Sequence, residues 1–286
     1  MEKELKIGIL GQGYVGSAMK IGFESLYPNL DTYDKYHIKK STVSSLHELV
    51  ENSDVIFICL PTPMKKNGEC DISIVDNEIK KINLLCENKR RVIVIKSTVP
   101  PGTTHKMDND YKNVSIVFNP EFLTELNFIE DFKSQNRIIL GGSKEAVNIV
   151  EKIYNKIFPN VPIIKTESQT AEMVKYLTNI FLATKVAFAN EMKIACDAIG
   201  IDYKKVIEYS LHDHRLGQSH WDVPGPDGKL GFGGSCFPKD INALIHFFDR
   251  HGLDNKLLKS VWETNLKVRP ERDWEKLKGR AIVDED

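Results

Sequence analysis

The stretch Lys6-Ile7-Gly8-Ile9-Leu10-Gly11-Gln12-Gly13-Tyr14-Val15-Gly16 decides the fold of this chain. Residues 6–10 form a short apolar run typical of a buried strand, and the three glycines that follow have the spacing G-x-G-x-x-G. A helical pattern continues to about residue 26, and a second strand over 30–34 ends in Asp34, 18 residues after Gly16. This order of strand, glycine-rich turn, helix and acidic strand end predicts a dinucleotide-binding fold.

Each part of this fingerprint has a physical role. Gly11 allows the tight turn, Gly13 lets the backbone approach a pyrophosphate, and Gly16 lets the helix pack closely on its strand. The Asp34 carboxylate would accept hydrogen bonds from ribose hydroxyls and repel a 2′-phosphate, which favours NAD over NADP, although Lys35 beside it weakens that preference. The alternative is a glycine-rich turn in a domain without a ligand. We expect the cofactor to contact Gly11, Gly13, Tyr14, Val15, Gly16, Asp34 and Lys35.

Strands and helices alternate through the first part of the chain. Residues 55–60 are fully apolar, which predicts a strand covered on both faces. Alternation of this kind builds β-α-β units, so the predicted class is α/β, with a Rossmann-type doubly wound parallel sheet. Further strands are expected at 92–95, 114–118, 137–140 and 162–164, and helices at 45–52, 72–86 and 144–157.

Near residue 166 the pattern becomes all helical. Residues 169–199 contain no glycine or proline and predict one helix of about 30 residues, about 45 Å long. Helices of that length usually link domains or pack against a partner chain. Shorter helices are expected at 203–210, 240–250 and 255–268, with a Gly/Pro-rich loop at 220–237. The predicted organisation is a Rossmann domain over 1–165, a helical domain over 166–268 and a C-terminal tail over 269–286.

Composition excludes several classes of protein. Lys plus Arg is 39 and Asp plus Glu is 40, so a net charge of −1 gives no bulk field for nucleic acid or an anionic membrane. No apolar run approaches the roughly 18 residues of a membrane span, and the charged start is not that of a signal peptide. The five cysteines are odd in number and widely spaced, which argues against disulfides or a zinc site and for the cytoplasm.

Further motifs resemble those of the UDP-glucose/GDP-mannose dehydrogenase family. The resemblance extends from residue 6 to about residue 265 and includes a very specific string before Asp240. It implies an oxidation of a nucleotide sugar's C6 alcohol to a carboxylate with two NAD and one water, a homodimer through the long helix, and no metal. UDP-glucose is the expected substrate; GDP-mannose and UDP-N-acetylmannosamine remain open. The motifs are Leu60-Pro61-Thr62-Pro63, Lys96-Ser97-Thr98-Val99-Pro100-Pro101-Gly102-Thr103, Asn119-Pro120-Glu121-Phe122-Leu123, Ala171-Glu172-Met173-Val174-Lys175, Asp213-His214-Arg215-Leu216-Gly217 and Gly231-Phe232-Gly233-Gly234-Ser235-Cys236-Phe237-Pro238-Lys239-Asp240.

Cys236 is the candidate nucleophile. An aldehyde intermediate cannot give up a second hydride until a nucleophile adds to it, and a thiolate forms a thiohemiacetal that is oxidised to a thioester. Cys236 lies in a glycine-rich loop just before a helix, where the helix dipole favours a thiolate. Outside this motif, a lone cysteine is more often a buried apolar residue.

The resemblance also implies roles for other residues. Lys175 and Asn179 are four apart on one helix face and match the pair that stabilises an oxyanion. Asp240 matches an acid that orders a water with Thr98, and Glu125 matches a candidate base for thioester hydrolysis. Each also has an ordinary interpretation as a surface or helix-capping charge. Cofactor contacts are expected at Pro61, Thr62 and Thr98, and substrate contacts at Glu121, Phe122, Leu123, Lys175, Asn179, Arg215, Phe232, Gly233 and Gly234.

The chain departs from the family in length. Family members carry a second Rossmann-like domain after the helical region, and this sequence stops where its first strand would begin. Three interpretations stay open: a shortened active enzyme, an enzyme completed by another subunit, and an NAD-binding accessory protein with a vestigial site. The related β-hydroxyacid dehydrogenases share the layout but need no cysteine, so the string around Cys236 disfavours them.

Overall fold

The computed structural model describes residues 4–86 and 89–284. The chain divides into two compact units: unit 1 comprises Met1–Thr62 and Ile72–Lys175, and unit 2 comprises Pro63–Asp71 and Tyr176–Asp286. This division differs from the expected boundary at residue 165. It falls inside the long helix, and it gives unit 2 both a short segment from the first half of the chain and the C-terminal residues.

Unit 1 is built on one seven-stranded sheet. The strand order is β2-β1-β3-β4-β5-β6-β7. Strand β2 is therefore added on one side of β1, and β3 to β7 are added on the other side. All neighbouring strands are parallel except β5 and β6, which pair antiparallel through Phe118 and Gly141. The Rossmann-type sheet is thus confirmed, with one antiparallel junction that the sequence did not predict. The strands are β1 (Ile7–Leu10), β2 (Asp31–Tyr33), β3 (Val55–Ile58), β4 (Arg91–Ile95), β5 (Val114–Phe118), β6 (Ile138–Gly141) and β7 (Ile163–Thr166).

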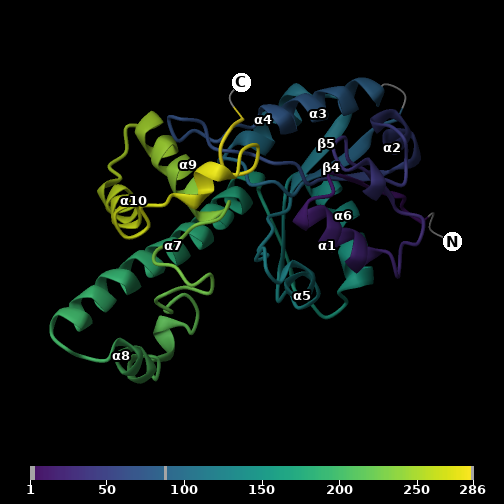
Figure 1. The fold of residues 1–286 in the computed structure, drawn as a ribbon. Helices are drawn as coiled ribbons and strands as arrows, with labels where there is room; N and C mark the ends of the chain where they lie inside the picture. The colour runs from purple at the N-terminus through teal and green to yellow at the C-terminus, as the bar shows by residue number, and fades with distance from the viewer. Residues whose placement is uncertain (1–3, 87–88, 285–286) are drawn as a thin grey trace. The chain divides into compact units, whose positions relative to one another are not determined.

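Helices cover both faces of this sheet (Figure 1). In β3, Val55 and Phe57 face a core formed with α1 and α6, whereas Ile56 and Ile58 face a second core formed with α2 and α3. This alternation explains why the strand reads as a continuous apolar run. The helices are α1 (Tyr14–Phe23), α2 (Leu46–Asn52), α3 (Ser73–Leu85), α4 (Thr103–Asp110), α5 (Phe128–Lys133) and α6 (Lys144–Ile157), with a 3-10 turn at Ile38–Lys40.

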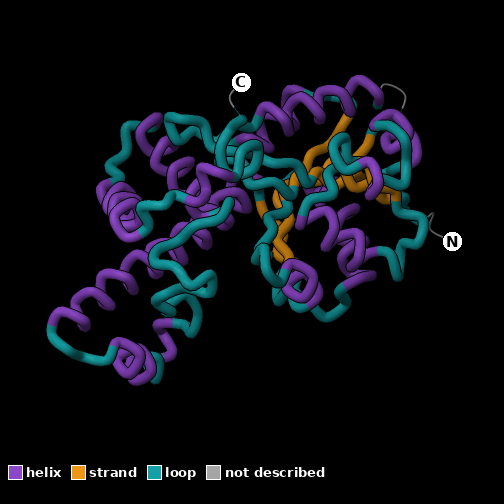
Figure 2. Tube along the Cα trace, in the orientation of Figure 1, coloured by secondary structure: helices purple, strands orange, loops and turns teal. Residues whose placement is uncertain are grey.

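Unit 2 is made of helices and connecting loops (Figure 2). The expected long helix is confirmed as α7, Ser168–Ala198, which begins in unit 1 and continues through unit 2. Two backbone bridges join Met64 to Cys70 and to Ile282. The segment treated above as a tail is packed, since Trp274 is only 1% exposed. The other helices are α8 (Tyr203–Ser210), α9 (Phe237–Arg250) and α10 (Lys256–Val268), with 3-10 turns at His214–Leu216 and Asp273–Lys276.

Within residues 4–86 and 89–284, no helix has both the length and the hydropathy needed to cross a membrane.

Candidate active site

The turn between β1 and α1 has the shape that a pyrophosphate needs. Gly11 has φ of 94°, and a Cβ there would lie 2.4 Å from the carbonyl oxygen of Cys59. A Cβ on Gly16 would lie 1.9 Å from the carbonyl oxygen of Gly11, so helix and turn approach as closely as the fingerprint predicts. A Cβ on Gly13 would meet nothing within 4 Å. The backbone that begins α1 is therefore open to a ligand phosphate.

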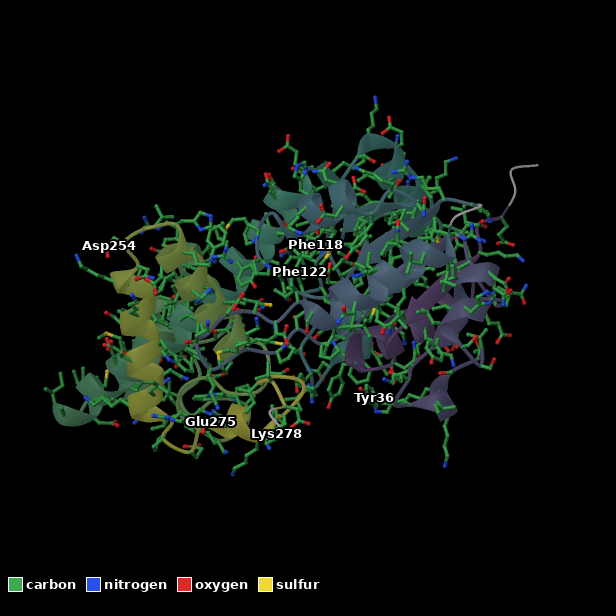
Figure 3. The ribbon with its side chains drawn as sticks, turned by 90° about the horizontal axis from the view of Figure 1, so that it is seen from above. Tyr36, Phe118, Phe122, Asp254, Glu275 and Lys278 are labelled. Atoms are coloured by element: carbon green, nitrogen blue, oxygen red, sulfur yellow. The ribbon has the colours of Figure 1, made fainter. Side chains whose placement is uncertain are left out.

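Asp34 lies at the end of β2 and is held by backbone N–H groups. Its Oδ2 accepts a hydrogen bond from Gln12 at 2.6 Å, and its Oδ1 accepts bonds from Tyr36 and His37 at 2.8 Å. Burial alone would raise the pKa of this carboxyl, but the N–H donors outweigh it and lower the pKa. An ionised acid at this position fits a ribose and disfavours a 2′-phosphate. The Lys35 ammonium lies 5.5 Å from the ring centroid of Tyr36, an exposed side chain (Figure 3).

The loops after β3 and β4 are joined to each other at the same sheet edge. The Thr62 hydroxyl donates to the carbonyl oxygen of Thr98 at 2.8 Å, and the backbone N–H of Leu60 donates to the Ser97 hydroxyl at 3.1 Å. This edge is the carboxyl end of the strands beside the β1/β3 reversal, where ligands of open α/β sheets bind. Pro61, on the same loop, is exposed.

Glu172 fixes the start of α4, which follows the Thr98 loop. Its two carboxylate oxygens accept hydrogen bonds from the backbone N–H groups of Gly102 (2.6 Å) and Thr104 (2.8 Å). The side chain is fully buried, and burial raises its pKa to about 7 despite those donors. The sequence showed Glu172 inside a motif but gave it no role.

A buried polar network lies beneath the turn after β5, which Phe118 and Phe122 bracket (Figure 3). The Lys96 ammonium lies 2.9 Å from Oε2 of Glu121 and donates to Oδ1 of Asn119 at 2.8 Å. The Tyr154 hydroxyl donates to the same Asn119 oxygen at 2.5 Å. Burial alone would lower the pKa of Lys96, but the Glu121 charge raises it on balance, so the ion pair is maintained.

Lys175 rests on the backbone of that turn. Its ammonium donates to the carbonyl oxygen of Glu121 and lies 5.2 Å from the ring centroid of Phe122. A hollow of about 270 Å³ adjoins this turn, and its lining includes Glu121, Phe122 and Leu123. Three of the expected substrate contacts thus share one cavity in unit 1, although the Glu121 carboxylate itself is paired with Lys96. Glu125 lies half-buried on the same loop.

In unit 2, Cys236 is the N-cap residue of α9. The N–H of Asp240, in the first turn of α9, donates to the Cys236 carbonyl oxygen at 3.0 Å. The Asp240 carboxylate is buried and has two partners: the Asn179 amide donates to Oδ2 at 2.6 Å, and the Lys239 ammonium lies 2.5 Å from Oδ1. Burial would lower the pKa of Lys239, but the Asp240 charge, followed by Cys70 and Cys236, raises it. This assembly holds a cation close to the sulfur.

The glycine-rich loop before Cys236 is held by neighbouring side chains. Asn265 accepts from the Phe232 N–H at 2.7 Å and donates to the Phe232 carbonyl oxygen at 2.9 Å. A Cβ on Gly233 would lie 2.3 Å from the Arg269 guanidinium, whereas Gly234, with φ of 70°, faces open space. The loop is thus packed against Arg269 at Gly233 and open on the Cβ side of Gly234.

Arg215 lies on the surface of unit 2. Its side chain is 90% exposed in a 3-10 turn, and Nε and Nη2 pair with the Asp213 carboxylate at 2.5–3.1 Å. Its expected contact with substrate stays a prediction.

The structure groups the expected residues by unit. The fingerprint glycines, Asp34, Thr62 and Thr98 line one sheet edge of unit 1, and Asn179, Asp240 and Cys236 gather in unit 2. Several residues of these networks were not predicted, among them Lys96, Glu172, Lys239 and Arg269. The first three lie inside the quoted motifs, and this position could have identified them as candidate site residues. Arg269 stood in none, because an ion-pair partner distant in sequence leaves no local pattern.

Two family models match the chain. The UDP-glucose/GDP-mannose dehydrogenase family NAD binding domain matches residues 28–158, and the central domain of the same family matches residues 169–267. A UDP-glucose 6-dehydrogenase from Rickettsia bellii is 40% identical over 88% of this chain and 59% of its own length. A GDP-mannose 6-dehydrogenase from Pseudomonas aeruginosa is 34% identical over 79% of this chain and 53% of its own length.

The solved structures agree with these matches. A UDP-glucose dehydrogenase from Pyrobaculum islandicum superposes with a TM-score of 0.85 at 29% identity, over 96% of this chain and 71% of that one. The chain spans less than two thirds of the length of the two curated relatives named above. Its first unit carries the NAD-binding domain that the fingerprint predicted. The chain belongs to the UDP-glucose/GDP-mannose dehydrogenase family.

Proposed function

We propose that this chain oxidises the C6 alcohol of a nucleotide sugar to the carboxylate, with UDP-glucose as the substrate. The observation that carries the proposal is Cys236 at the N-cap of α9, on a loop that is open at Gly234 and beside the buried Lys239–Asp240 pair. UDP-glucose is favoured over GDP-mannose because the relative named for it is more similar to this chain, 40% against 34%. NAD⁺ supplies the hydride acceptor for both oxidations.

Cys236 makes the second oxidation possible. After the alcohol has lost a hydride and its hydroxyl proton, the sulfur bonds to C6 of the aldehyde and the thiol proton passes to the sugar oxygen. Loss of the second hydride and of that proton leaves a thioester on Cys236. Water then bonds to C6, the C–S bond breaks, and the sulfur recovers a proton as the acid leaves. The balance is one alcohol, two NAD⁺ and one water giving one carboxylate, two NADH and three protons.

Lys175 and Asn179 are proposed to stabilise negative charge on the sugar oxygen. Both are buried, and they lie one turn apart in α7. The Asn179 amide is oriented by Asp240, and the Lys175 ammonium is oriented by the carbonyl oxygen of Glu121. Preorganised donors of this kind favour the developing oxyanion because they need little reorganisation during the reaction.

Hydrolysis of the thioester needs an acceptor for a water proton. Asp240 and Glu125 are the proposed candidates, with Thr98 helping to order the water. Asp240 has both oxygens engaged by Asn179 and Lys239, so its carboxylate has a fixed direction. Glu125 is half-buried on the loop beside the 270 Å³ hollow. Thr98 is held in place through its backbone carbonyl by Thr62.

The test is a substrate panel of UDP-glucose, GDP-mannose and UDP-N-acetylmannosamine, with NADH followed by absorbance and the product identified by mass. We expect two NADH and one sugar acid from UDP-glucose, and no acid from Cys236→Ala. Cys196→Ala, a change at a buried cysteine of α7, is the matched control and retains activity. Acid formation by Cys236→Ala would refute the covalent route. NAD binding without turnover on any sugar would favour the accessory-protein alternative.

A homodimer through α7 is also proposed. Leu177, Phe181, Phe188 and Met192 follow one stripe of the helix at spacings of 4, 7 and 4, and the first two are 65% and 62% exposed. Exposed apolar stripes of this size are typical of protein interfaces. A second copy of the same stripe is its natural partner, because two-fold interfaces pair a surface with itself.

A further inference from the structure

Arg269 follows the last residue of α10 and is one of the most deeply buried charges in the described chain, with 2% exposure. Its guanidinium donates in three directions: Nε to Oδ1 of Asp273 and Nη2 to Oδ2 of Asp227, each at 2.6 Å, and Nη1 to the carbonyl oxygen of Leu230 at 3.2 Å. Two carboxylates thus compensate one buried cation, as burial of a charge requires.

The guanidinium also packs against the loop that leads to Cys236. A Cβ on Gly233 would lie 2.3–2.6 Å from three guanidinium atoms, so only glycine lets the backbone lie this close to Arg269. The second oxygen of Asp273 accepts the N–H of Gly234 at 3.1 Å. Asp273 therefore links Arg269 to the backbone two residues before the sulfur.

The contact with Asp273 lies midway along the loop, between two segments that are held by other elements. Asn265 holds the backbone of Phe232, and α9 begins at Phe237. Between them, the Gly234 N–H donates to Asp273 at 3.1 Å, Arg280 donates to the Ser235 hydroxyl at 3.3 Å, and that hydroxyl lies 3.9 Å from the Cys236 sulfur. Gly234 has φ of 70° and a Cβ there would meet nothing within 4 Å, so no side chain packs against that side of its backbone.

We propose that Arg269 is a positioning residue for Cys236: with Asp273 and Asp227, it fixes the loop that presents the sulfur. A direct role in binding substrate does not fit, because the guanidinium is buried and each of its three nitrogens donates to a protein acceptor. The effect of Arg269 on catalysis rests on the proposed function. Its effect on the position of the loop does not depend on that function.

The first test measures the mobility of the loop in the NAD-free protein. Lysine keeps the charge but lacks the planar fork that reaches two carboxylates and a carbonyl. Arg269→Lys should therefore raise the rate of Cys236 alkylation by iodoacetamide about tenfold, since at least one charge-assisted hydrogen bond is lost. Peptide mass spectrometry also follows Cys196, which is buried in the same unit and reports opening of the whole unit.

Arg272→Lys is the matched control, because that side chain is half exposed and pairs only weakly, at 3.5 Å, with Glu275. Faster alkylation of Cys236 with Cys196 still protected supports the proposal. Equal acceleration of both cysteines, or of neither, overturns it. If Arg269→Lys does not fold, Asp273→Asn is judged by the same criteria.

The second test is kinetic. A displaced sulfur should lower kcat about 100-fold in Arg269→Lys while KM changes little, because alignment is lost rather than binding. A rise in KM with kcat unchanged overturns the positioning role. If the wild-type protein oxidises no sugar in the panel, the proposed function fails, and the alkylation experiment alone decides the role of Arg269.

Discussion

Replacing Glu172 by glutamine should change how the stability of this protein depends on pH. Glu172 is fully buried in α7, and its pKa is raised from 4.5 to about 7, first by burial. The unfolded chain loses this proton near pH 4.5, whereas the folded chain keeps it until about pH 7. Between these values the folded state binds more protons, so the contribution of Glu172 to stability falls as the pH rises.

The magnitude follows from the shift. The difference of about 2.5 pKa units corresponds to about 3 kcal/mol, of which about 2.5 kcal/mol is lost between about pH 5 and about pH 8.5. Glutamine has no such titration. Its single oxygen can accept from one of the two backbone N–H groups of Gly102 and Thr104, and its NH2 group then faces the other N–H. This mismatch costs about 1 kcal/mol or more at every pH.

The assay is urea unfolding of the wild type and Glu172→Gln, followed by circular dichroism at both pH values. We expect the free energy of unfolding of the variant, relative to wild type, to improve by about 2.5 kcal/mol from about pH 5 to about pH 8.5. Glu145→Gln, a change at an exposed residue in the first turn of α6, is the control and should show no such trend. A constant difference between Glu172→Gln and wild type would refute the reasoning.

Two further predictions concern the buried ion pair and the long helix. Lys96→Met should lower the free energy of unfolding by about 3–5 kcal/mol because it leaves the Glu121 carboxylate without its cation, and adding Glu121→Gln should restore part of the loss. Urea titrations of the two variants check this, and equal stability of single and double variants would contradict it. Phe181→Glu should convert a dimer into monomers, measured by light scattering after gel filtration, with exposed Leu257→Glu on α10 as control. A wild-type monomer, or a variant that remains dimeric, would exclude the α7 interface.

Much of unit 1 could be predicted because its sequence patterns are local. The apolar run of β3 predicts a strand that is buried on both faces, and the glycines after β1 predict a tight turn into a helix. The structure confirms both. Two short helices, α4 and α5, were missed. α4 has eight largely polar residues, and its start is stabilised by Glu172, about 70 residues further along the chain. A helix fixed by a distant carboxylate shows little apolar periodicity in its own sequence.

The site was predictable to the extent that motifs mark it. Cys236 lies at the start of α9, as its motif predicted, whereas the contact of Asn179 with Asp240 was not predicted. The pairing of Glu121 with Lys96 was not foreseen, because a carboxylate that contacts a ligand and one that neutralises a buried lysine look the same in sequence. Arg269 was treated as part of a tail, since Asp227 and Leu230, about 40 residues earlier in the chain, become its neighbours only on folding.

The path of the chain around residues 63–71 has a consequence for dissection of the protein. This nine-residue excursion leaves unit 1 after β3 and forms hydrogen bonds through Met64 with Ala281 and Val283. A ribosome must therefore reach residue 283 before the excursion meets its partner. A single cut therefore does not separate the two units cleanly. A fragment ending at Lys175 would still contain residues 63–71 without their backbone partners at 281 and 283, and such exposed backbone groups promote aggregation during expression.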